Sequence, residues 1–341
     1  MDETLQPFPF LALVGQAELK TALLLGLINP GLGGILISGP YGVGKTSAVR
    51  GLLDLLPLHQ ATAEQPAVRM RLIELPLNAR LEDVVGTLNE RVAIEQQRVQ
   101  LEPGILAHAD GNLLYVDEIN LLAPAVADSI LDAAAQGRTL VRRGAATRLY
   151  PSRFVLIGSL NPEEGELRPQ ILDRFGLRVW VAPLDDPQQR LEVYRRAQAF
   201  RQDPADFRAK YASQTAALAE EVEAARAILP HVLVPPAIEV QALALVQALQ
   251  VPSHRAEIAL LEGARARAAA DFRTLVNLDD LRRVAPLALR QRQSPQIAAH
   301  GQRHQTERAM IEATLAQIIG ESPPNDPASA TTTLRQIEST E

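Results

Sequence analysis

The chain has 341 residues, 47% of them hydrophobic and 22% charged, which is typical of a globular protein long enough for one large domain and a smaller one. Its formal charge of −6 and pI of about 5.6 lack the basic excess of nucleic-acid binders, so contact with nucleic acid is not expected. There is no cysteine, which excludes disulfides, thiolate metal sites and thiol nucleophiles. Acidic residues near the N-terminus and the lack of a run of about 18 apolar residues predict a cytoplasmic protein without a membrane span.

Five short apolar runs, rich in β-branched residues, are separated by helical stretches. Runs of this length that are continuously apolar suit strands covered on both faces, as in a parallel sheet between helices. They therefore predict an α/β core with a five-stranded parallel sheet that ends near residue 190. The runs are 34–38, 71–75, 112–117, 154–159 and 177–182.

The first run leads directly into GPYGVGKT (39–46), which matches the phosphate-loop pattern G-x-x-x-x-G-K-[ST] and precedes a helical stretch. In such a loop, backbone N–H groups and the positive end of the helix dipole bind phosphate, while Lys45 meets the β- and γ-phosphates and Thr46 binds Mg²⁺. The alternative is a glycine-rich turn without a ligand. Lysine occurs elsewhere only at Lys20 and Lys210, the rest of the 34 basic residues being arginine, so its presence in the loop favours phosphate binding. The predicted nucleotide-binding residues are Gly39, Pro40, Tyr41, Gly42, Val43, Gly44, Lys45, Thr46 and Asp117.

The third run, LLYVDEIN (113–120), ends in two carboxylates, Asp117 and Glu118. Acids that emerge from a buried strand are costly unless they meet a cation or water. Asp117 is predicted to hold Mg²⁺ through water, and Glu118 to orient and polarise the water that attacks the γ-phosphate. Two acids after a strand are weak evidence alone, but their position about 70 residues after a phosphate loop strengthens it.

The segment QGRTLVRRGAATRLYPSR (136–153) predicts a β-hairpin with Gly144 at its turn. It holds the one distinctly basic patch of the sequence. No series of aromatic residues accompanies the arginines, which disfavours binding of single-stranded nucleic acid. The arginines are Arg138, Arg142, Arg143, Arg148 and Arg153.

The fourth run is followed by NPEEGELRPQILDRFG (161–176), in which both signs of charge surround an Asn, a Pro and an Asp-Arg-Phe. A solvated connecting loop would explain it without any function.

The rest of the chain is rich in alanine and helical periodicity. Amphipathic stretches at 218–229, 237–249, 254–272 and 278–292 predict a linker followed by a small helical bundle. Arg255 lies two residues after a possible N-cap, Ser253, in a first turn where the helix dipole disfavours a cation. An exposed arginine without a role is the alternative. Beyond residue 292 the composition predicts a largely disordered tail. The predicted divisions are 1–190, 191–230, 231–292 and 293–341.

These motifs resemble those of the AAA+ ATPases, and more closely the chelatase group among them. The resemblance covers roughly 8–292 and is most specific in NPEEGELRPQILDRFGL (161–177). It implies an α/β nucleotide domain with a helical lid. The sequence is similar to those of the ATPase (I) subunits of magnesium chelatases, which drive Mg²⁺ into protoporphyrin IX for chlorophyll and bacteriochlorophyll synthesis.

The resemblance implies roles for residues beyond the phosphate loop. Asn161 resembles sensor 1, which helps hold the attacking water, and Arg174 resembles the arginine finger, which acts on a neighbour's nucleotide. An arginine finger that acts on a neighbour's nucleotide implies a ring of subunits. In this family the ring has six subunits. Asp173 would orient that arginine or pair across the interface. Arg255 resembles sensor 2, which touches the γ-phosphate from the lid and couples the position of the lid to the nucleotide state, and Arg282 is the competing candidate.

The family reading implies a hydrolase that uses ATP and Mg²⁺. Its partners would be a D-type subunit with a metal-ion-dependent adhesion domain and a large porphyrin-binding H-type subunit. The six histidines are scattered, so the chain itself is not expected to bind porphyrin strongly. In helicase relatives a hairpin like 136–153 touches nucleic acid, whereas in chelatase-type rings it faces partner subunits.

Departures from the family pattern leave alternatives open. The phosphate loop has Pro40 and Tyr41 where members usually show Asp-Arg, and the insertion at 59–70 is short. A related MoxR- or chelatase-type ATPase could remodel a different von Willebrand-type partner or serve a cobalt chelatase. A nucleic-acid motor and a non-hydrolysing nucleotide-binding scaffold are further alternatives.

Overall fold

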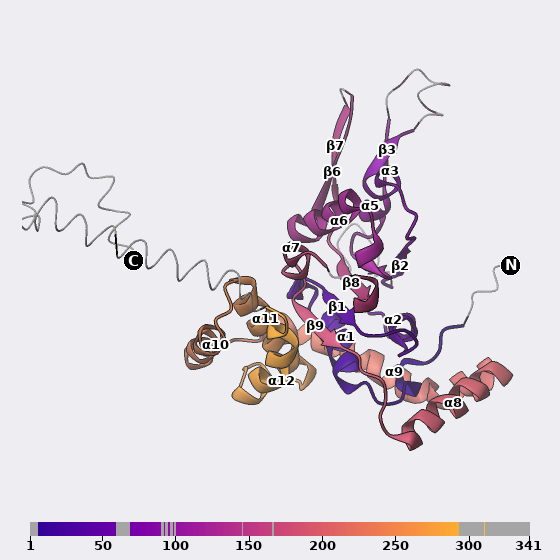
Figure 1. The fold of residues 1–341 in the computed structure, drawn as a ribbon, viewed down its shortest axis with the longest axis vertical. Helices are drawn as coiled ribbons and strands as arrows, with labels where there is room; N and C mark the ends of the chain where they lie inside the picture. Colours follow the sequence, from indigo (N-terminus) through magenta and orange to yellow (C-terminus); the bar gives the residue numbers. More distant parts are fainter. Residues whose placement is uncertain are drawn as a thin grey trace, which may run out of the picture. The chain divides into compact units, whose positions relative to one another are not determined.

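A sheet of five parallel strands lies at the centre of the fold in the computed structural model (Figure 1). The structure describes residues 6–58, 69–89, 92, 95, 98, 100–144, 146–165, 167–292 and 310. All of them except Met310 belong to one unit, Met1–Gln293, and Ser294–Glu341 form a second. In the described part of the chain, no helix is long and apolar enough to cross a membrane.

The strand order in the sheet is β2-β5-β8-β1-β9, and each neighbouring pair is parallel. Each strand coincides with one of the five apolar runs, so the predicted five-stranded parallel sheet is confirmed. Because all strands run the same way, the residues that follow β1, β5 and β8 meet at one edge. The strands are β1 (Ile35–Ser38), β2 (Leu72–Leu75), β5 (Leu113–Val116), β8 (Val155–Leu160) and β9 (Leu177–Trp180).

Helices cover both faces of this sheet. On one face pack α1 (Ala17–Ile28), α2 (Lys45–Gly51) and helices from the C-terminal half of the described chain. On the other pack the shorter α3, α5 and α7 together with α6. The remaining bounds are α3 (Leu81–Val85), α5 (Ile105–His108), α6 (Pro124–Gln136), α7 (Pro169–Leu172), α8 (Pro187–Gln202), α9 (Pro204–Ile228), α10 (Pro236–Ala248), α11 (Arg255–Ala270) and α12 (Leu278–Leu289).

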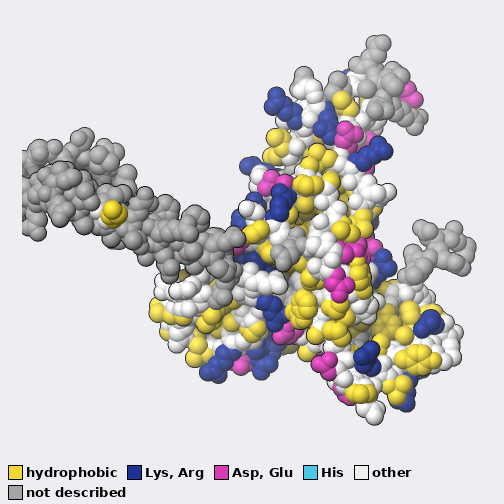
Figure 2. All heavy atoms as spheres, viewed as in Figure 1, with side chains coloured by type: hydrophobic (Ala, Val, Ile, Leu, Met, Phe, Trp, Pro, Cys, Tyr) yellow, Lys and Arg dark blue, Asp and Glu magenta, His cyan; other side chains and the backbone are white. Residues whose placement is uncertain are grey.

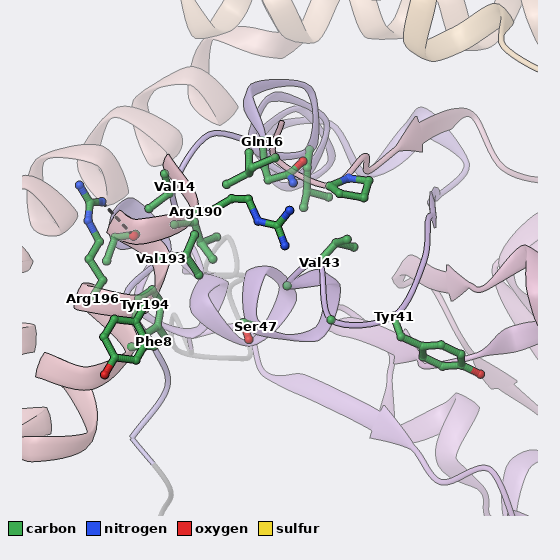
Figure 3. Close-up of a pocket in the computed structure, with 18 of the residues that line it drawn as sticks. Phe8, Val14, Gln16, Tyr41, Val43, Ser47, Arg190, Val193, Tyr194 and Arg196 are labelled. Atoms are coloured by element: carbon green, nitrogen blue, oxygen red, sulfur yellow. Dashed lines mark hydrogen bonds between the residues drawn. The ribbon is translucent and has the colours of Figure 1, made fainter. Parts of the chain in front are cut away.

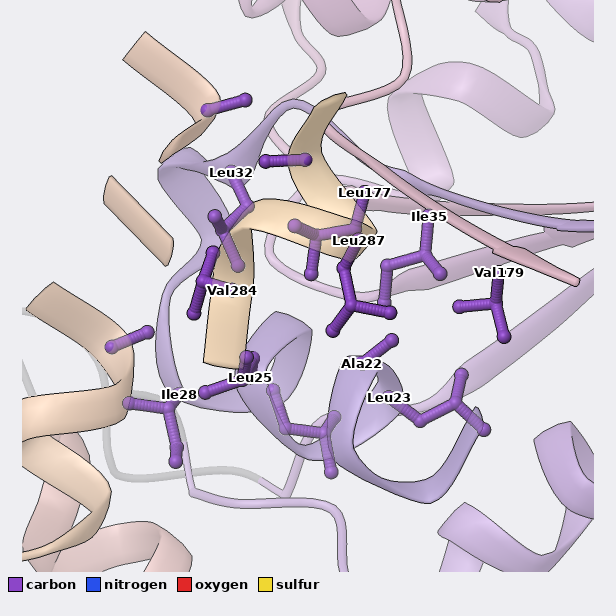
Figure 4. Close-up of a cluster of buried hydrophobic side chains, with 14 of the residues drawn as sticks. Ala22, Leu23, Leu25, Ile28, Leu32, Ile35, Leu177, Val179, Val284 and Leu287 are labelled. Carbon is purple, nitrogen blue, oxygen red and sulfur yellow. The ribbon is translucent and has the colours of Figure 1, made fainter. Parts of the chain in front are cut away.

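Alternation along β1 explains the two apolar layers. Successive side chains of a strand point to opposite faces, so Ile35 and Ile37 join the layer of α1, while Leu36 joins that of α6. In Figure 4, Leu287 of α12 lies beside Leu177, and Val284 of the same helix lies near Leu32, in the first of these layers. The predicted helical lid (237–249, 254–272 and 278–292) is confirmed as α10, α11 and α12, and it shares its apolar core with the sheet.

Two hairpins extend from the sheet side by side (Figure 1). The predicted one is confirmed as β6 (Arg138–Arg143) and β7 (Ala146–Pro151), with Gly144 at φ 58° in the turn. The other, β3 (Gly86–Leu88) with β4 (Leu101–Pro103), is not expected from the sequence, because three-residue strands are too short for a periodic pattern. The Tyr150 hydroxyl joins the hairpins by donating to the Leu101 carbonyl at 3.1 Å.

Two helices, α8 and α9, fill the region predicted as a helical linker. Each begins with an aspartate N-cap and a proline at the first helical position, a combination that suits a helix start. Asp186 accepts from the Gln188 amide, and Asp203 from the Asp206 amide, both at 2.9 Å. The predicted domain divisions stay predictions. The predicted disordered tail from 293 on and most of the short insertion at 59–70 lie outside the described residues.

Candidate nucleotide site and arginine cluster

The phosphate loop connects β1 to α2 at the carboxyl edge of the sheet. Gly42 and Gly44 have φ of 73° and 89°, in the left-handed region that glycine adopts without strain. A Cβ at either position would have no atom within 4 Å, so this backbone faces open space. Gly44 is the N-cap of α2, which directs the free N–H groups of the first turn toward the loop. This is the geometry that binds phosphate.

The Lys45 amino group lies over this loop. It donates to the carbonyls of Gly39, Pro40 (3.1 Å) and Leu160 (3.4 Å). Partial burial lowers the pKa of Lys45, whereas the nearby carboxylates of Asp117 and Glu118 act to raise it. The lysine is therefore held at the loop by backbone oxygens, close to two acids.

Asp117 is surrounded by hydroxyl groups. Its Oδ2 accepts from Thr46 Oγ1 at 3.1 Å, and its Oδ1 accepts from the Tyr115 hydroxyl at 2.8 Å and from Ser159. The Thr46 hydroxyl, in the first turn of α2, and the Asp117 carboxylate, just after β5, form an oxygen set that fits Mg²⁺, which also takes phosphate and water oxygens. Among the described residues no group of three or more His, Asp or Glu could hold a metal. Thr46 and Asp117 are thus the pair that would hold Mg²⁺.

Glu118 has an unusual backbone, with φ 49°, where a residue other than glycine is strained. Its amide donates to Ser159 Oγ at 2.9 Å, which helps to hold this conformation. Desolvation raises the pKa of the Glu118 carboxyl, and the negative charges of Glu164 and Asp117 raise it further, against the effect of Lys45. A perturbed carboxyl beside a phosphate loop suits a group that polarises water.

Asn161 is fully buried at the end of β8. Its side-chain oxygen accepts from the Glu163 amide at 3.2 Å, whereas its Nδ2 has no hydrogen-bond partner in the described part of the chain. A buried donor without a partner is costly and suggests a ligand group. Asn161 thus lies where the sequence predicts sensor 1, at the same edge as the phosphate loop.

A pocket of about 680 Å³ opens beside the phosphate loop (Figure 3). Its walls come from the loop, from the segment before α1, and from α8, and they include apolar and arginine side chains. In Figure 3 Tyr41 points away from the other labelled residues. The pocket residues that the motifs did not indicate include Val14, Gln16, Leu184, Arg190, Val193 and Tyr194.

Arg174 lies at the opposite edge of the sheet. The amides of Gly176 and Leu177 donate to the Gly34 carbonyl, and Leu177 is in register with Ile35, where β1 begins. The phosphate loop starts where β1 ends, four residues on, which is about 13 Å along a strand. Arg174 is therefore separated from its own phosphate loop by the length of the strand.

Arg255, the first residue of α11, contacts Asp173, which directly precedes Arg174 in the sequence. Its Nη1 donates to Asp173 at 3.1 Å, while Arg174 itself contacts Asp132 and the Leu131 carbonyl of α6, both at 3.4 Å. The Asp173 carboxylate pairs with Arg255 and with Arg292 and not directly with Arg174 among the described residues. That it orients Arg174 through these pairs, or contacts a neighbouring subunit, stays a prediction. The competing candidate, Arg282, lies on the exposed side of α12.

Comparisons with known proteins identify the family of this chain. The family model "Magnesium chelatase, subunit ChlI" matches residues 10–172, and the model "AAA lid domain" matches 239–313. The magnesium-chelatase 38 kDa subunit of Acidiphilium rubrum is 43% identical over 312 residues, which cover 84% of this chain and 90% of that protein. The chain belongs to the ChlI/BchI family of magnesium-chelatase AAA+ ATPases.

Two further relatives of this ChlI-family chain are a subunit of a magnesium-chelatase complex and a longer, uncharacterized protein. A chain of a solved complex between subunits BchI and BchD of magnesium chelatase is 38% identical, with 84% of this chain and 96% of that chain covered and a TM-score of 0.48. The uncharacterized protein Rv2850c of Mycobacterium tuberculosis is 41% identical over 334 residues. That match covers 95% of this chain, which spans 52% of the mycobacterial protein.

The β6–β7 hairpin of this ChlI-family chain carries basic and apolar groups together. Figure 2 shows basic side chains over it, which are arginines in this part of the sequence. Leu140 and Leu149, exposed by 57% and 51%, lie opposite each other across the strands. The guanidinium of Arg148 stacks over the Tyr150 ring at 5.0 Å. The role of the hairpin stays a prediction.

Proposed function

We propose that this chain is the Mg²⁺-dependent ATPase motor of a chelatase. It would hydrolyse ATP in a ring of six subunits, the ring size that the resemblance to chelatase ATPases implies. The observation that carries the proposal is the contact between Thr46 and Asp117 at 3.1 Å beneath a phosphate loop with Lys45. ATP would place its phosphates on the loop and its nucleoside part in the 680 Å³ pocket. Bound Mg²⁺ would supply charge neutralisation of the phosphates.

The chain's own residues divide the work between two subunits. Glu118 would polarise the attacking water, and the free Nδ2 of Asn161 would donate to that water or to the γ-phosphate. Arg174 and Arg255, at the far edge of the sheet, would stabilise charge on the nucleotide of the next subunit. The separation of these arginines from their own phosphate loop supports a head-to-tail arrangement.

The substrate of the assembly would be Mg²⁺ inserted into protoporphyrin IX, a step of chlorophyll and bacteriochlorophyll synthesis. The partners would be a D-type subunit with a metal-ion-dependent adhesion domain and a large porphyrin-binding H-type subunit. Family membership supports this assignment. Reconstitution of this chain with such subunits should give ATP-dependent Mg²⁺ insertion, measured by porphyrin fluorescence. ATPase activity without any insertion would contradict the chelatase role and leave the ATPase intact.

A second function is favoured by one observation, the match to the mycobacterial protein over 95% of this chain, against 84% for the chelatase subunit from Acidiphilium rubrum. In that case the ATPase would serve another metal chelatase or remodel a different von Willebrand-type partner. Insertion of Co²⁺ but not Mg²⁺ in the same reconstitution would favour the first of these. Stimulation by DNA or RNA would instead favour a nucleic-acid motor.

Two substitutions test the ATPase itself. Lys45→Ala should abolish nucleotide binding, because the loop loses its only ammonium donor, and binding is measured with a fluorescent ATP analogue. Arg174→Ala should bind ATP normally and hydrolyse it roughly 10³-fold more slowly. Normal ATP affinity in Lys45→Ala would rule out the phosphate-loop assignment.

Mixing variants tests whether the finger acts between subunits. A Glu118→Gln subunit cannot hydrolyse ATP but still carries an intact Arg174, so it should restore turnover at the site of an Arg174→Ala subunit. The measurement is the ATPase rate of mixtures whose co-assembly is verified. Co-assembly without any recovery would contradict an arginine supplied by the neighbour.

A further inference from the structure

Two buried arginines connect the lid to the segment that carries Arg174. Arg178, in β9, and Arg292, just after α12, have exposed fractions of 2% and 6%. Arginine is almost never fully buried unless its guanidinium is paired. Neither residue belongs to a motif, and both lie outside the nucleotide site described above.

Arg178 holds the segment that follows the lid helix α12. Its Nη1 donates to the carbonyls of Arg290 (3.1 Å) and Gln291 (2.6 Å), and its Nη2 donates to the Leu172 carbonyl at 2.5 Å. Both of the first two carbonyls belong to residues that follow α12, so Arg178 connects the chain that leaves the lid to β9 and to α7. Burial lowers the pKa of Arg178 to about 9, with a further contribution from Arg292, which reflects the cost of removing this charge from water.

Arg292 makes the reciprocal connection from the lid to the sheet. Its guanidinium donates to Asp173 Oδ1 at 3.0 Å and to the carbonyls of Phe175 (2.7 Å) and Gly176 (3.1 Å). A fourth bond, to the Ala288 carbonyl at 2.6 Å, fixes the guanidinium to α12. The residues on both sides of Arg174 are thus held by one side chain.

The backbone at this point leaves no room for adjustment. A Cβ on Gly176 would lie 1.6 Å from the Leu32 carbonyl oxygen, so the chain passes there at van der Waals contact. Asp173 meanwhile accepts from both Arg292 and Arg255. Arg174, Asp173, Arg255 and Arg292 therefore belong to one connected group that spans the sheet and the lid.

We propose that Arg292 is a positioning residue for hydrolysis: it fixes the Arg174 segment to the lid, so that Arg174 and Arg255 reach the neighbouring subunit's nucleotide as one rigid unit. This inference rests on the proposed ring ATPase. Packing two apolar side chains would hold lid and sheet together at lower desolvation cost. Three directional bonds to the residues on either side of Arg174 instead fix the backbone that carries its guanidinium, and a displacement of about 1 Å costs roughly 10²-fold in rate.

The test uses the full chain with Arg292→Met and Arg292→Lys. Both should bind the fluorescent ATP analogue within about twofold of the parent and hydrolyse ATP on the order of 10²-fold more slowly. Lysine keeps the charge but cannot reproduce the fork of bonds, so it secures a folded variant if methionine destabilises the lid. Arg283→Met, on the exposed side of α12, is the control and should keep full turnover.

Mixed assemblies separate positioning from a structural role. Glu118→Gln subunits, whose arginines are intact, should restore turnover at the sites of Arg292→Lys subunits, whereas Arg174→Ala subunits should not. If Glu118→Gln rescues Arg174→Ala but not Arg292→Lys, Arg292 supports its own subunit's site and the positioning role is overturned. If Arg174→Ala is not rescued either, the intersubunit finger fails, and the inference fails with it.

Discussion

The Ser159 side chain helps to position both acids of the candidate site, Asp117 and Glu118. Its hydroxyl donates to Asp117 and accepts from the Glu118 amide, so one oxygen orients the carboxylate expected to hold Mg²⁺ and the strained backbone of the carboxylate expected to polarise water. The Tyr115 hydroxyl, by contrast, bonds to one of the two acids, Asp117, and also contacts the hydroxyls of Thr46 and Ser159. The Tyr115 hydroxyl therefore supports Asp117, whereas the Ser159 hydroxyl supports both Asp117 and Glu118. Substitution of each residue can separate the two effects.

Ser159→Ala should lower turnover at saturating ATP by roughly 10- to 100-fold, because a group that orients metal and water ligands is lost and the Glu118 amide is left without its partner. Tyr115→Phe should mainly raise the Mg²⁺ concentration needed for half-maximal activity. Steady-state ATPase assays over a range of Mg²⁺ concentrations measure both effects. Equal losses in the two variants would show that Ser159 does not support Glu118.

At the scale of elements, α8 forms a wall of the pocket beside the phosphate loop although it begins beyond the last strand of the sheet. Val193 lines the pocket, whereas Leu191, two residues earlier, does not, and their side chains are similarly exposed, by 45% and 42%. A functional helix without a single buried residue gives no periodic signal. This is why the sequence indicated the phosphate loop but not the wall beside it.

Val193→Asp should weaken ATP affinity about tenfold or more, since it places a charge in a pocket proposed to take the nucleoside part of ATP. Leu191→Asp on the same helix is the matched control and should leave affinity unchanged. Titration of the fluorescent analogue measures both. An equal loss in the control would mean that α8 acts through its stability and not through the pocket.

The strands and lid helices could be predicted because local patterns encode them, whereas the arginine cluster could not. Continuous apolar runs marked each strand, and the phosphate loop, Asp117 and Glu118 follow strands directly. The partners of Asp173, by contrast, lie 82 and 119 residues away in the chain. Arg178 looked like one polar residue in the apolar run 177–182, and only the packed lid shows that its guanidinium meets backbone carbonyls.

On the scale of the whole molecule, the sheet separates two half-sites. The carboxyl edge holds the loop and acids, and the amino edge holds Arg174 and Arg255, so one chain offers both halves at opposite edges. In the proposed ring, such a heterologous surface would pair head to tail with further copies. Nucleotide binding would then require one chain, whereas hydrolysis would require two.

Dilution should therefore lower the ATPase rate per subunit while ATP binding persists, because assembly follows mass action. The measurement is specific activity across a dilution series, with the fluorescent analogue followed in parallel. Addition of Glu118→Gln subunits at high dilution should recover the rate, since they supply arginines without hydrolysing ATP. A specific activity independent of concentration would contradict the divided site.

The near absence of lysine makes the phosphate loop accessible to amine chemistry. An acylating reagent meets only the N-terminus and three side chains, of which Lys210 is exposed and paired with Asp206 and Lys20 donates to the Leu13 carbonyl. The lowered pKa of Lys45 leaves more of its amine neutral and nucleophilic. Acylation of Lys45 relative to Lys210, followed by mass spectrometry, should fall as ATP is added, and so report loop occupancy in each subunit of a mixed assembly without any engineered label.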